Sequence, residues 1–216
     1  MEYEGVLRDG TRVLFRPIRP DDKDALRAGF EQLSPESRYR RFFRPIDHLS
    51  EKDLRYLTEV DFKDHFAWLA VLPDAPGSPG AGVARWIRIP GEPAVAEGAI
   101  TVVDSMHNQG IGTMLLWLLG RSAIERGIEA IRVWVQGENH PMLDLLKNIG
   151  AKPKGWEGGV AEMDIPLPPT VDRLPIPATA VLKAVARGAG YGEAEGQTRA
   201  GTRLVPPDDA GAPDRT

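Results

Sequence analysis

The sequence predicts a single mixed α/β domain, in which helices cover a central β-sheet. The order of its elements is the main reason: helix-like patterns lie between 20 and 56, strand-like runs follow between 66 and 103, and strand and helix then alternate up to 165. Of the 216 residues, 42% are hydrophobic, which is enough for one core. A chain of this length has room for one ordinary domain with an appendage.

The first part of the body contains one strand pattern and three helix patterns. The run 12–16, RVLFR, places apolar, β-prone residues between two arginines and is predicted to be a strand with a buried face. Each helix pattern begins at a residue type that caps free backbone N–H groups. These caps are Asp21 or Asp22 for the first helix, Ser34 before Pro35 for the second, and Ser50 for the third, which ends near Tyr56.

The second part of the body consists mainly of apolar strands separated by turns and helices. An apolar run of helical length, closed by Gly127, predicts the clearest helix. Strands are expected at 66–72, 82–89, 97–103, 131–135 and 160–165, and helices at 112–126 and 141–148. The domain is therefore expected to occupy 5–165.

The composition changes after this domain. The segment 166–216 is rich in proline and glycine and has one aromatic residue, Tyr191, so buried surface cannot offset its ordering entropy. We expect 166–187 to be an extension, in which 175–187 forms either a short docked helix or a transient one. The tail, 188–216, is predicted to be disordered.

Charge and cysteine content exclude several classes of protein. The formal net charge of −4 argues against a nucleic-acid partner, and the absence of cysteine excludes disulfides, cysteine-ligated metal centres and thiol nucleophiles. His48, His65 and His140 have no metal-ligand spacing, so no metal is expected. The longest apolar run, 114–119, is too short to span a membrane, and the N-terminus has no signal-peptide core. We therefore expect a cytoplasmic protein without a membrane partner.

The stretch that carries the most chemical information is 97–126, where a strand leads through a turn, HNQGIG, into the long helix. Such a turn directs several backbone N–H groups toward one point, and the positive end of the helix dipole adds to them. Gly110 and Gly112 allow close approach of a ligand and a positive φ. The turn therefore suits a phosphate or pyrophosphate, although a plain helix entrance would show the same pattern.

Two other phosphate-binding motifs do not fit this turn. A dinucleotide-binding fingerprint needs a third glycine where the chain has Leu115. A P-loop needs Gly-Lys-Ser/Thr, and the sequence does not contain that triplet.

Three matches resemble one family. The turn HNQGIG with its apolar helix resembles the pyrophosphate turn, Q/R-x-x-G-x-G/A, of the GCN5-related N-acetyltransferases (GNAT). Asn139, followed by a helix and Gly150, resembles a later part of the family pattern. RPIRPDD (16–22) with LSPESRYRRFF (33–43) resembles the acetyltransferase domain of bacterial Pat-type protein lysine acetyltransferases. The resemblance implies the GNAT fold: a mixed, mostly antiparallel central sheet with a splayed parallel strand pair and flanking helices.

The resemblance also implies a cosubstrate, acetyl-CoA, and the residues that bind it. The strand backbone at Thr101, Val102 and Val103 would hold the pantetheine arm, and Asn139 would contact that arm, cap the next helix, or do both. His107 replaces the usual Gln or Arg, and would either add a donor or point to solvent. The pyrophosphate turn would be formed by His107, Asn108, Gln109, Gly110, Ile111, Gly112 and Thr113.

Acetyl transfer to an amine needs a neutral nitrogen, so a base must accept a proton near pH 7. Glu97 lies ten residues before His107, the spacing of the general base in GCN5-like enzymes. The resemblance implies this role for Glu97, at the start of its strand; a salt-bridged carboxylate at a strand edge is the other interpretation. Many family members have a tyrosine general acid where this chain has Leu146, so no general acid is assigned.

The expected acceptor is an amine, and the Pat resemblance favours a protein lysine. The cluster Arg38, Arg40, Arg41 and Arg44 would flank the acceptor or cofactor entrance, or form a solvated helix face. Two alternatives stay open: a small-molecule amine N-acetyltransferase, and an acyl-CoA-binding sensor or scaffold without turnover. Both a monomer and a homodimer are compatible with the sequence.

Overall fold

A computed structural model describes residues 2–7 and 9–174, and places them in one eight-stranded sheet with helices on its faces. The strands are β1 (Tyr3–Val6), β2 (Arg12–Pro17), β3 (His65–Val71), β4 (Gly80–Ile89), β5 (Glu92–Val102), β6 (Ala130–Gln136), β7 (Lys152–Glu157) and β8 (Val160–Pro166). The α-helices are α1 (Lys23–Glu31), α2 (Pro35–Phe42), α3 (Glu51–Thr58), α4 (Ile111–Ile124) and α5 (His140–Asn148), and short 3-10 turns are η1 (Pro20–Asp22), η2 (Asp104–Met106) and η3 (Val171–Arg173). The helix expected at 175–187 and the disordered tail expected at 188–216 lie outside the described residues.

The sheet is antiparallel except at one place. Its strand order is β1-β2-β3-β4-β5-β6-β8-β7, and only β5 and β6 run parallel within the described chain. Their ladder is short, from Val95↔Ala130 to Glu97↔Arg132. Beyond it the two strands no longer pair, and we call the unpaired edge of β5 from Gly98 to Val102 the opening of the sheet. This confirms the predicted mixed, mostly antiparallel sheet with a splayed parallel pair.

Gly98 follows the last residue pair of this ladder, where β5 and β6 begin to separate. A Cβ atom added there would lie 2.2 Å from Cγ2 of Ile131, so any side chain at this position would require the Ile131 side chain or β6 to shift. Glycine is therefore required for the strands to approach this closely before they part.

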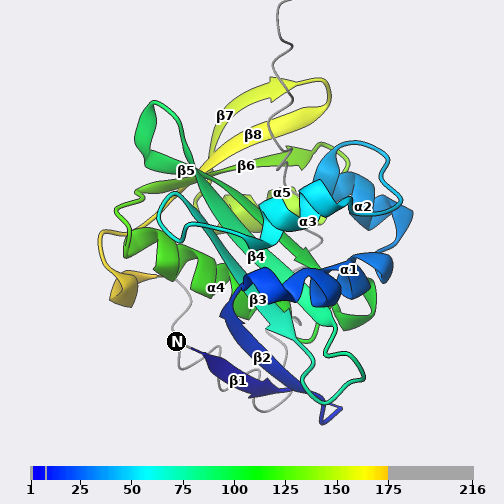
Figure 1. Ribbon diagram of the computed structural model, residues 1–216. Helices are drawn as coiled ribbons and strands as arrows, with labels where there is room; N and C mark the ends of the chain where they lie inside the picture. Colours follow the sequence, from blue (N-terminus) through cyan, green and yellow to red (C-terminus); the bar gives the residue numbers. More distant parts are fainter. Residues whose placement is uncertain (1, 8, 175–216) are drawn as a thin grey trace, which may run out of the picture.

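The two faces of the sheet are covered by different helices. Figure 1 shows α1, α2 and α3 together on the near face of the sheet. A Cβ atom on Gly82 would meet Leu115 and Ile111 of α4, so Gly82 and, by alternation, Ala84 and Trp86 face that helix. Val83 alternates to the face under α1–α3, and its partner Thr101 shares that face.

Each face has its own apolar core. The larger core lies around α4, which is apolar on most of its circumference and fully buries Met114, Leu115 and Leu118 against the sheet. The smaller core holds α1–α3 together and consists of Phe30, Leu33, Phe42, Leu49, Leu54 and Leu57. Because these helices share a core, they form one layer rather than three separate attachments.

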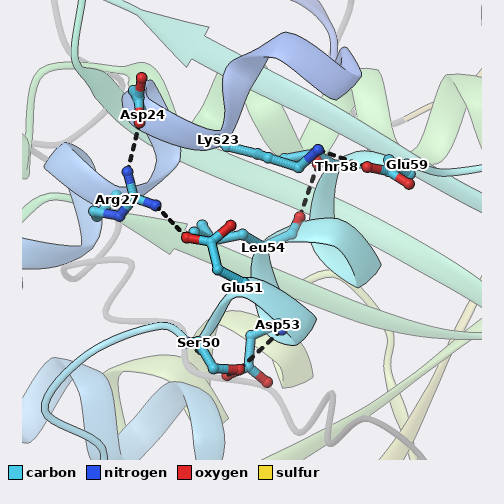
Figure 2. Close-up of polar contacts among 9 residues, drawn as sticks. All are labelled: Lys23, Asp24, Arg27, Ser50, Glu51, Asp53, Leu54, Thr58 and Glu59. Carbon is cyan, nitrogen blue, oxygen red and sulfur yellow. Dashed lines mark hydrogen bonds and ion pairs between the residues drawn. The ribbon is translucent and has the colours of Figure 1, made fainter.

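Polar contacts fix the register of α1 on α3 (Figure 2). Lys23 Nζ lies 2.5 Å from Glu59 Oε1, and Arg27 Nη2 lies 2.8 Å from Glu51 Oε1. These pairs are partly exposed, so each contributes at most about 1 kcal/mol. Ser50 and Asp53 cap each other's backbone N–H groups at the start of α3, as the sequence predicts for Ser50.

The segment RPIRPDD folds around a buried ion pair. Both terminal nitrogens of Arg16 donate to the Asp22 carboxylate, at 2.7 and 2.6 Å, and the backbone N–H of Arg19 donates to it at 2.6 Å. Of the two expected caps, Asp21 and Asp22, the Asp22 side chain accepts a backbone N–H at the start of this helical stretch, in the capping box of η1, but it forms no cap hydrogen bond to α1 itself. The Arg16–Asp22 ion pair anchors the entry to α1 on β2.

Three features of the sheet differ from the sequence-based expectation. β1 and β7 were not predicted, and β5 begins at Glu92 rather than at 97. Glu97 therefore lies in the middle of β5 and not at its start. In the described ranges, no helix has the length and apolar character needed to cross a membrane.

Candidate functional site

Glu97 occupies the point where the parallel strands separate. It pairs with Arg132 at the last step of the β5–β6 ladder and with Ile87 on β4. By alternation along β5, its side chain shares a face with Thr101, under the α1–α3 layer. Glu97 as a residue is half-buried, but its Oε1 atom is buried, so this end of the carboxylate is shielded from solvent beneath the α1–α3 layer.

A buried arginine on α2, Arg41, interacts electrostatically with Glu97. Arg41 is 5% exposed, and burial lowers the pKa of its guanidinium to about 10, while the charge of Glu97 acts in the opposite direction. The guanidinium is still protonated at neutral pH. The carboxylate of Glu97, where β5 and β6 separate, is thus paired in charge with the guanidinium of Arg41 on α2.

A second buried arginine lies beside the first. Arg85 on β4 is 1% exposed, donates to the carbonyl of Leu57 at 3.0 Å, and has Nη1 at 2.8 Å from Nε2 of His65. Burial, with the charge of Arg41, lowers the pKa of Arg85 to about 9. Burial and the charge of Arg85 lower the pKa of His65 to about 3, so His65 is neutral and accepts the hydrogen bond.

The arginines of α2 do not form one basic face. Arg38 lies over the ring of Phe30 at 4.6 Å from its centroid, and Arg40 forms an ion pair with Glu36 on the same helix. Arg44 is exposed beyond the helix. Of these four arginines only Arg41 is fully buried, and the sequence did not distinguish it from its neighbours.

The turn before α4 has the shape expected of an anion site. Asn108 and Gly110 have φ values of +61° and +90°, and Gly110 caps the helix without a side-chain hydrogen bond. The backbone N–H groups of Ile111, Gly112 and Thr113 therefore begin the helix without a side-chain acceptor. This terminus can donate to an oxyanion.

The side chains of the turn point back at the protein. Nε2 of His107 lies 3.0 Å from the carbonyl oxygen of Val102, and Gln109 donates to the carbonyl of Ser105 at 3.4 Å. His107 is half-buried. In this structure it neither points to solvent nor into the turn, and it links the turn to the end of β5.

The edge of β5 that faces the opening follows from its hydrogen bonds to β4. The N–H of Val103 donates to Ala81 at 2.9 Å, so the backbone groups of Thr101 and Val103 are directed at β4. The backbone groups of Val102 and Ile100 alternate to the other side, toward the opening. The backbone groups of both Ile100 and Val102 can therefore pair with a ligand. Of these two positions, the sequence had indicated only Val102.

Asn139 and Leu146 both belong to α5. The side chain of Asn139, 2% exposed, accepts from the N–H of Met142 at 3.4 Å, so it caps the helix as expected. Leu146 is 3% exposed and lines an apolar cavity of about 30 Å³ beneath the splay, together with Gly98 and Ile131. This position can pack against a ligand but cannot donate a proton.

Asp104 connects the turn region to α2, 70 positions away in the chain. Its carboxylate accepts from the N–H of Ser34 at 2.7 Å and from the hydroxyl of Ser37 at 2.6 Å. Partial burial alone would raise the pKa of Asp104, but these hydrogen bonds lower it below its ordinary value. The segment LSPESRYRRFF is therefore fixed to the end of β5 at its start and presents Arg41 at its end.

The geometry contains no arrangement typical of a metal centre among the described residues. There, no group of three histidine or carboxylate side chains is close enough to hold an ion.

Comparison with known proteins places this geometry in a family. Residues 12–152 match the model of the acetyltransferase (GNAT) domain. The acetyltransferase Pat of Mycolicibacterium smegmatis is 32% identical over 169 residues, which cover 78% of this chain and 50% of that protein. The chain thus spans half the length of this relative.

Solved structures agree with this placement. The crystal structure of the GNAT domain of S. lividans PAT has 34% sequence identity and a TM-score of 0.67, and the match covers 77% of this chain and 97% of that one. A more distant structure, yncA of Salmonella typhimurium with its cofactor acetyl-CoA, shares the fold at 13% identity and a TM-score of 0.56, over 72% and 94% of the two chains. The splayed sheet, the turn before α4 and these matches have one explanation: the chain belongs to the GNAT family of acetyltransferases.

Proposed function

We propose that this chain transfers an acetyl group from acetyl-CoA to an amine, with Glu97 as the general base. The observation that carries the proposal is the place of Glu97, at the last step of the parallel ladder, where an opening begins along β5. A carboxylate there faces the reacting end of any ligand whose chain pairs with the exposed edge of β5.

The residues present fit the cosubstrate. The N-terminus of α4, with its positive-φ residues Asn108 and Gly110, would bind the pyrophosphate through the N–H groups of 111–113. The backbone of Ile100 and Val102 would pair with the amides of the pantetheine arm. When bound, acetyl-CoA supplies an activated thioester, whose C–S bond is exchanged for the C–N bond of an amide.

Glu97 supplies the proton acceptor that this exchange needs. An ammonium has no lone pair, so its proton must move to the carboxylate, directly or through one water, before nitrogen can form the new bond. Arg41 balances the negative charge of Glu97 before this transfer. The departing thiolate needs no general acid from α5, where Leu146 is apolar, because a thiolate is a stable anion near neutral pH.

The proposed acceptor is a protein lysine, and one recess supports it. A hollow of about 460 Å³ lies between the end of α2 and strands β6–β8. It is lined by the aromatic side chains of Phe43 and Trp134 and by the carboxylates of Glu157 and Glu162. Aromatic faces and carboxylates together attract a primary ammonium on an apolar stem. The resemblance of 16–22 and 33–43 to Pat-type protein lysine acetyltransferases favours the same acceptor class.

The test compares Glu97→Gln with the wild-type chain on acetyl-CoA and a lysine-containing protein. We expect kcat at pH 7.5 to fall by about 10²–10⁴-fold, the usual contribution of a general base. The dissociation constant of acetyl-CoA, measured by calorimetry, should stay within about twofold. The residual rate should rise about tenfold per pH unit below the acceptor's pKa, because hydroxide then replaces the missing base.

The matched control is Glu129→Gln, on the exposed segment between α4 and β6, which should leave the rate unchanged. Equal turnover in Glu97→Gln and wild type would remove Glu97 from the mechanism. Tight binding of acetyl-CoA with no thiol release, on lysine proteins and on small amines alike, would instead identify a binding protein without turnover.

A further inference from the structure

Arg85 has no negatively charged partner among the described residues. It is 1% exposed, and its hydrogen-bond partners are the carbonyl of Leu57 and the ring of His65. His65 is neutral, because burial and Arg85 itself lower the pKa of the ring to about 3. Among residues 2–7 and 9–174, no carboxylate forms a hydrogen bond or ion pair with Arg85, and its Nε has no partner.

The charge around Arg85 is not balanced. The strongest electrostatic effect on Arg85 comes from Arg41, a second buried cation, whose charge lowers the pKa of Arg85. The carboxylate of Glu97 in turn favours the charged form of Arg41. Two guanidinium groups therefore share the charge of one carboxylate. Burying a cation without a compensating negative charge costs several kcal/mol in general. Two buried arginines near one carboxylate are therefore expected where a bound anion supplies the missing negative charge.

Both arginines line the same cavity. It has a volume of about 60 Å³ and lies between the α1–α3 layer and strands β3–β5, several times the space that one water molecule needs. Apart from the arginines and Thr101, its wall consists of apolar side chains and glycine backbone. The hydroxyl oxygen of Thr101 is buried and has no hydrogen-bond partner in the described chain.

These groups define the ligand by its chemistry. The apolar wall suits a short chain of a few carbon atoms, and a cationic wall with a free hydroxyl suits a carboxylate at the end of that chain. The bidentate geometry of guanidinium makes arginine the usual partner of a carboxylate.

We propose that this cavity binds a carboxylate carried on a short apolar chain, with Arg85 and Arg41 as its cationic partners and Thr101 as a hydroxyl donor. Resting on the proposed function, we assign the carboxylate to the acyl group of the donor, as in malonyl-CoA or succinyl-CoA. The reason is that Arg41, on the cavity wall, interacts electrostatically with Glu97, so the cavity lies next to the proposed position of the thioester. Such a chain would transfer a dicarboxylic acyl group in addition to, or in preference to, acetyl.

The first experiment measures binding of acyl-CoA pairs that differ in charge. We expect the wild-type chain to bind succinyl-CoA at least tenfold more tightly than butyryl-CoA, and malonyl-CoA more tightly than propionyl-CoA. Arg85→Gln should abolish this preference while changing the affinity for butyryl-CoA by less than about threefold. Thr101→Val should reduce the preference several-fold, and the exposed control Arg55→Gln on α3 should retain it.

A second arm identifies the source of the carboxylate. With acetyl-CoA as the donor, turnover of 4-aminobutyrate is compared with that of butylamine. A preference for 4-aminobutyrate that Arg85→Gln removes would assign the carboxylate to the acceptor. No charge preference in either arm, or a preference that Arg85→Gln retains, would overturn the proposal.

A third readout does not depend on coenzyme A. Propionate at about 100 mM should raise the melting temperature of the wild-type chain above that in chloride of equal ionic strength, and Arg85→Gln should lose the difference. If coenzyme A itself does not bind, the proposed function fails while this readout still tests the cavity. If Arg85→Gln does not fold, Arg85→Lys replaces it in the test. Lysine keeps the positive charge but lacks the bidentate guanidinium geometry, so this variant should retain only part of the preference for carboxylate-bearing acyl groups.

Discussion

His65 is a neutral histidine held next to a cation, and this makes the fold sensitive to acid. Burial and the charge of Arg85 lower its pKa to about 3, although Asp61 opposes them. In the unfolded chain the pKa of histidine is about 6.5. Below that pH, His65 is protonated in the unfolded state but stays neutral in the folded state. The stability is therefore complete above about pH 6.5 and falls, by up to about 1.4 kcal/mol per unit, as the pH drops toward 3.

The variant His65→Gln tests this linkage, because glutamine can still accept from Arg85. Between pH 7 and pH 5, the wild-type free energy of unfolding should fall by about 2 kcal/mol more than that of the variant, as measured by urea titration. The exposed His48→Gln serves as the control and should behave as wild type. Parallel losses in His65→Gln and wild type would show that His65 is protonated in the folded state.

Helix α2 reaches the site because Asp104 holds its first turn. The two hydrogen bonds from Ser34 and Ser37 join α2 to the segment between β5 and the turn of α4. Occupancy of that turn should therefore restrain α2, and with it Arg41. In Asp104→Asn one acceptor oxygen is lost, which should cost about 1–3 kcal/mol of stability.

Hydrogen exchange can measure this coupling. Saturating coenzyme A should slow amide exchange in 37–42 several-fold in the wild-type chain and much less in Asp104→Asn. As a control, Asp53→Asn breaks the capping box of α3 at a similar cost and should leave the response of α2 intact. Equal protection of α2 in both chains would mean that Asp104 does not carry the coupling between the turn and the helix.

The elements that sequence reasoning located are those whose signal is local. Ser34 and Ser50 cap helices as predicted because a cap involves residues three positions apart. β7 was missed because its sequence, KPKGWE, is exposed throughout and interrupted by proline and glycine. The partnership of Asp104 with Ser34, like the pairing of Arg85 with His65, joins distant positions and leaves no periodic trace. The turn at 107–112 could be predicted from the sequence. The positions of Arg41 and Arg85 near Glu97 could not.

The molecule as a whole is two antiparallel sheet halves held by one short parallel ladder. β1–β5 form one half and β6–β8 the other (Figure 1). Arg132, 5% exposed, sits at the seam and bonds to Glu92 on β5 at 2.7 Å and to Asp164 on β8 at 2.8 Å. It closes the base of the opening, directly beside Glu97 in the register.

Replacing Arg132 with methionine should loosen this seam, because the new side chain keeps the apolar stem but bonds to neither half. We expect the melting temperature to fall by several degrees and the dissociation constant of acetyl-CoA to rise roughly tenfold, since the proposed arm site depends on the spacing of β5 and β6. Arg12→Met removes an arginine that is 50% exposed and pairs at the far edge of the sheet, so it should change neither quantity much. If Arg132→Met lowers the melting temperature while the affinity for acetyl-CoA stays at the wild-type value, the seam stabilises the fold without setting the width of the opening.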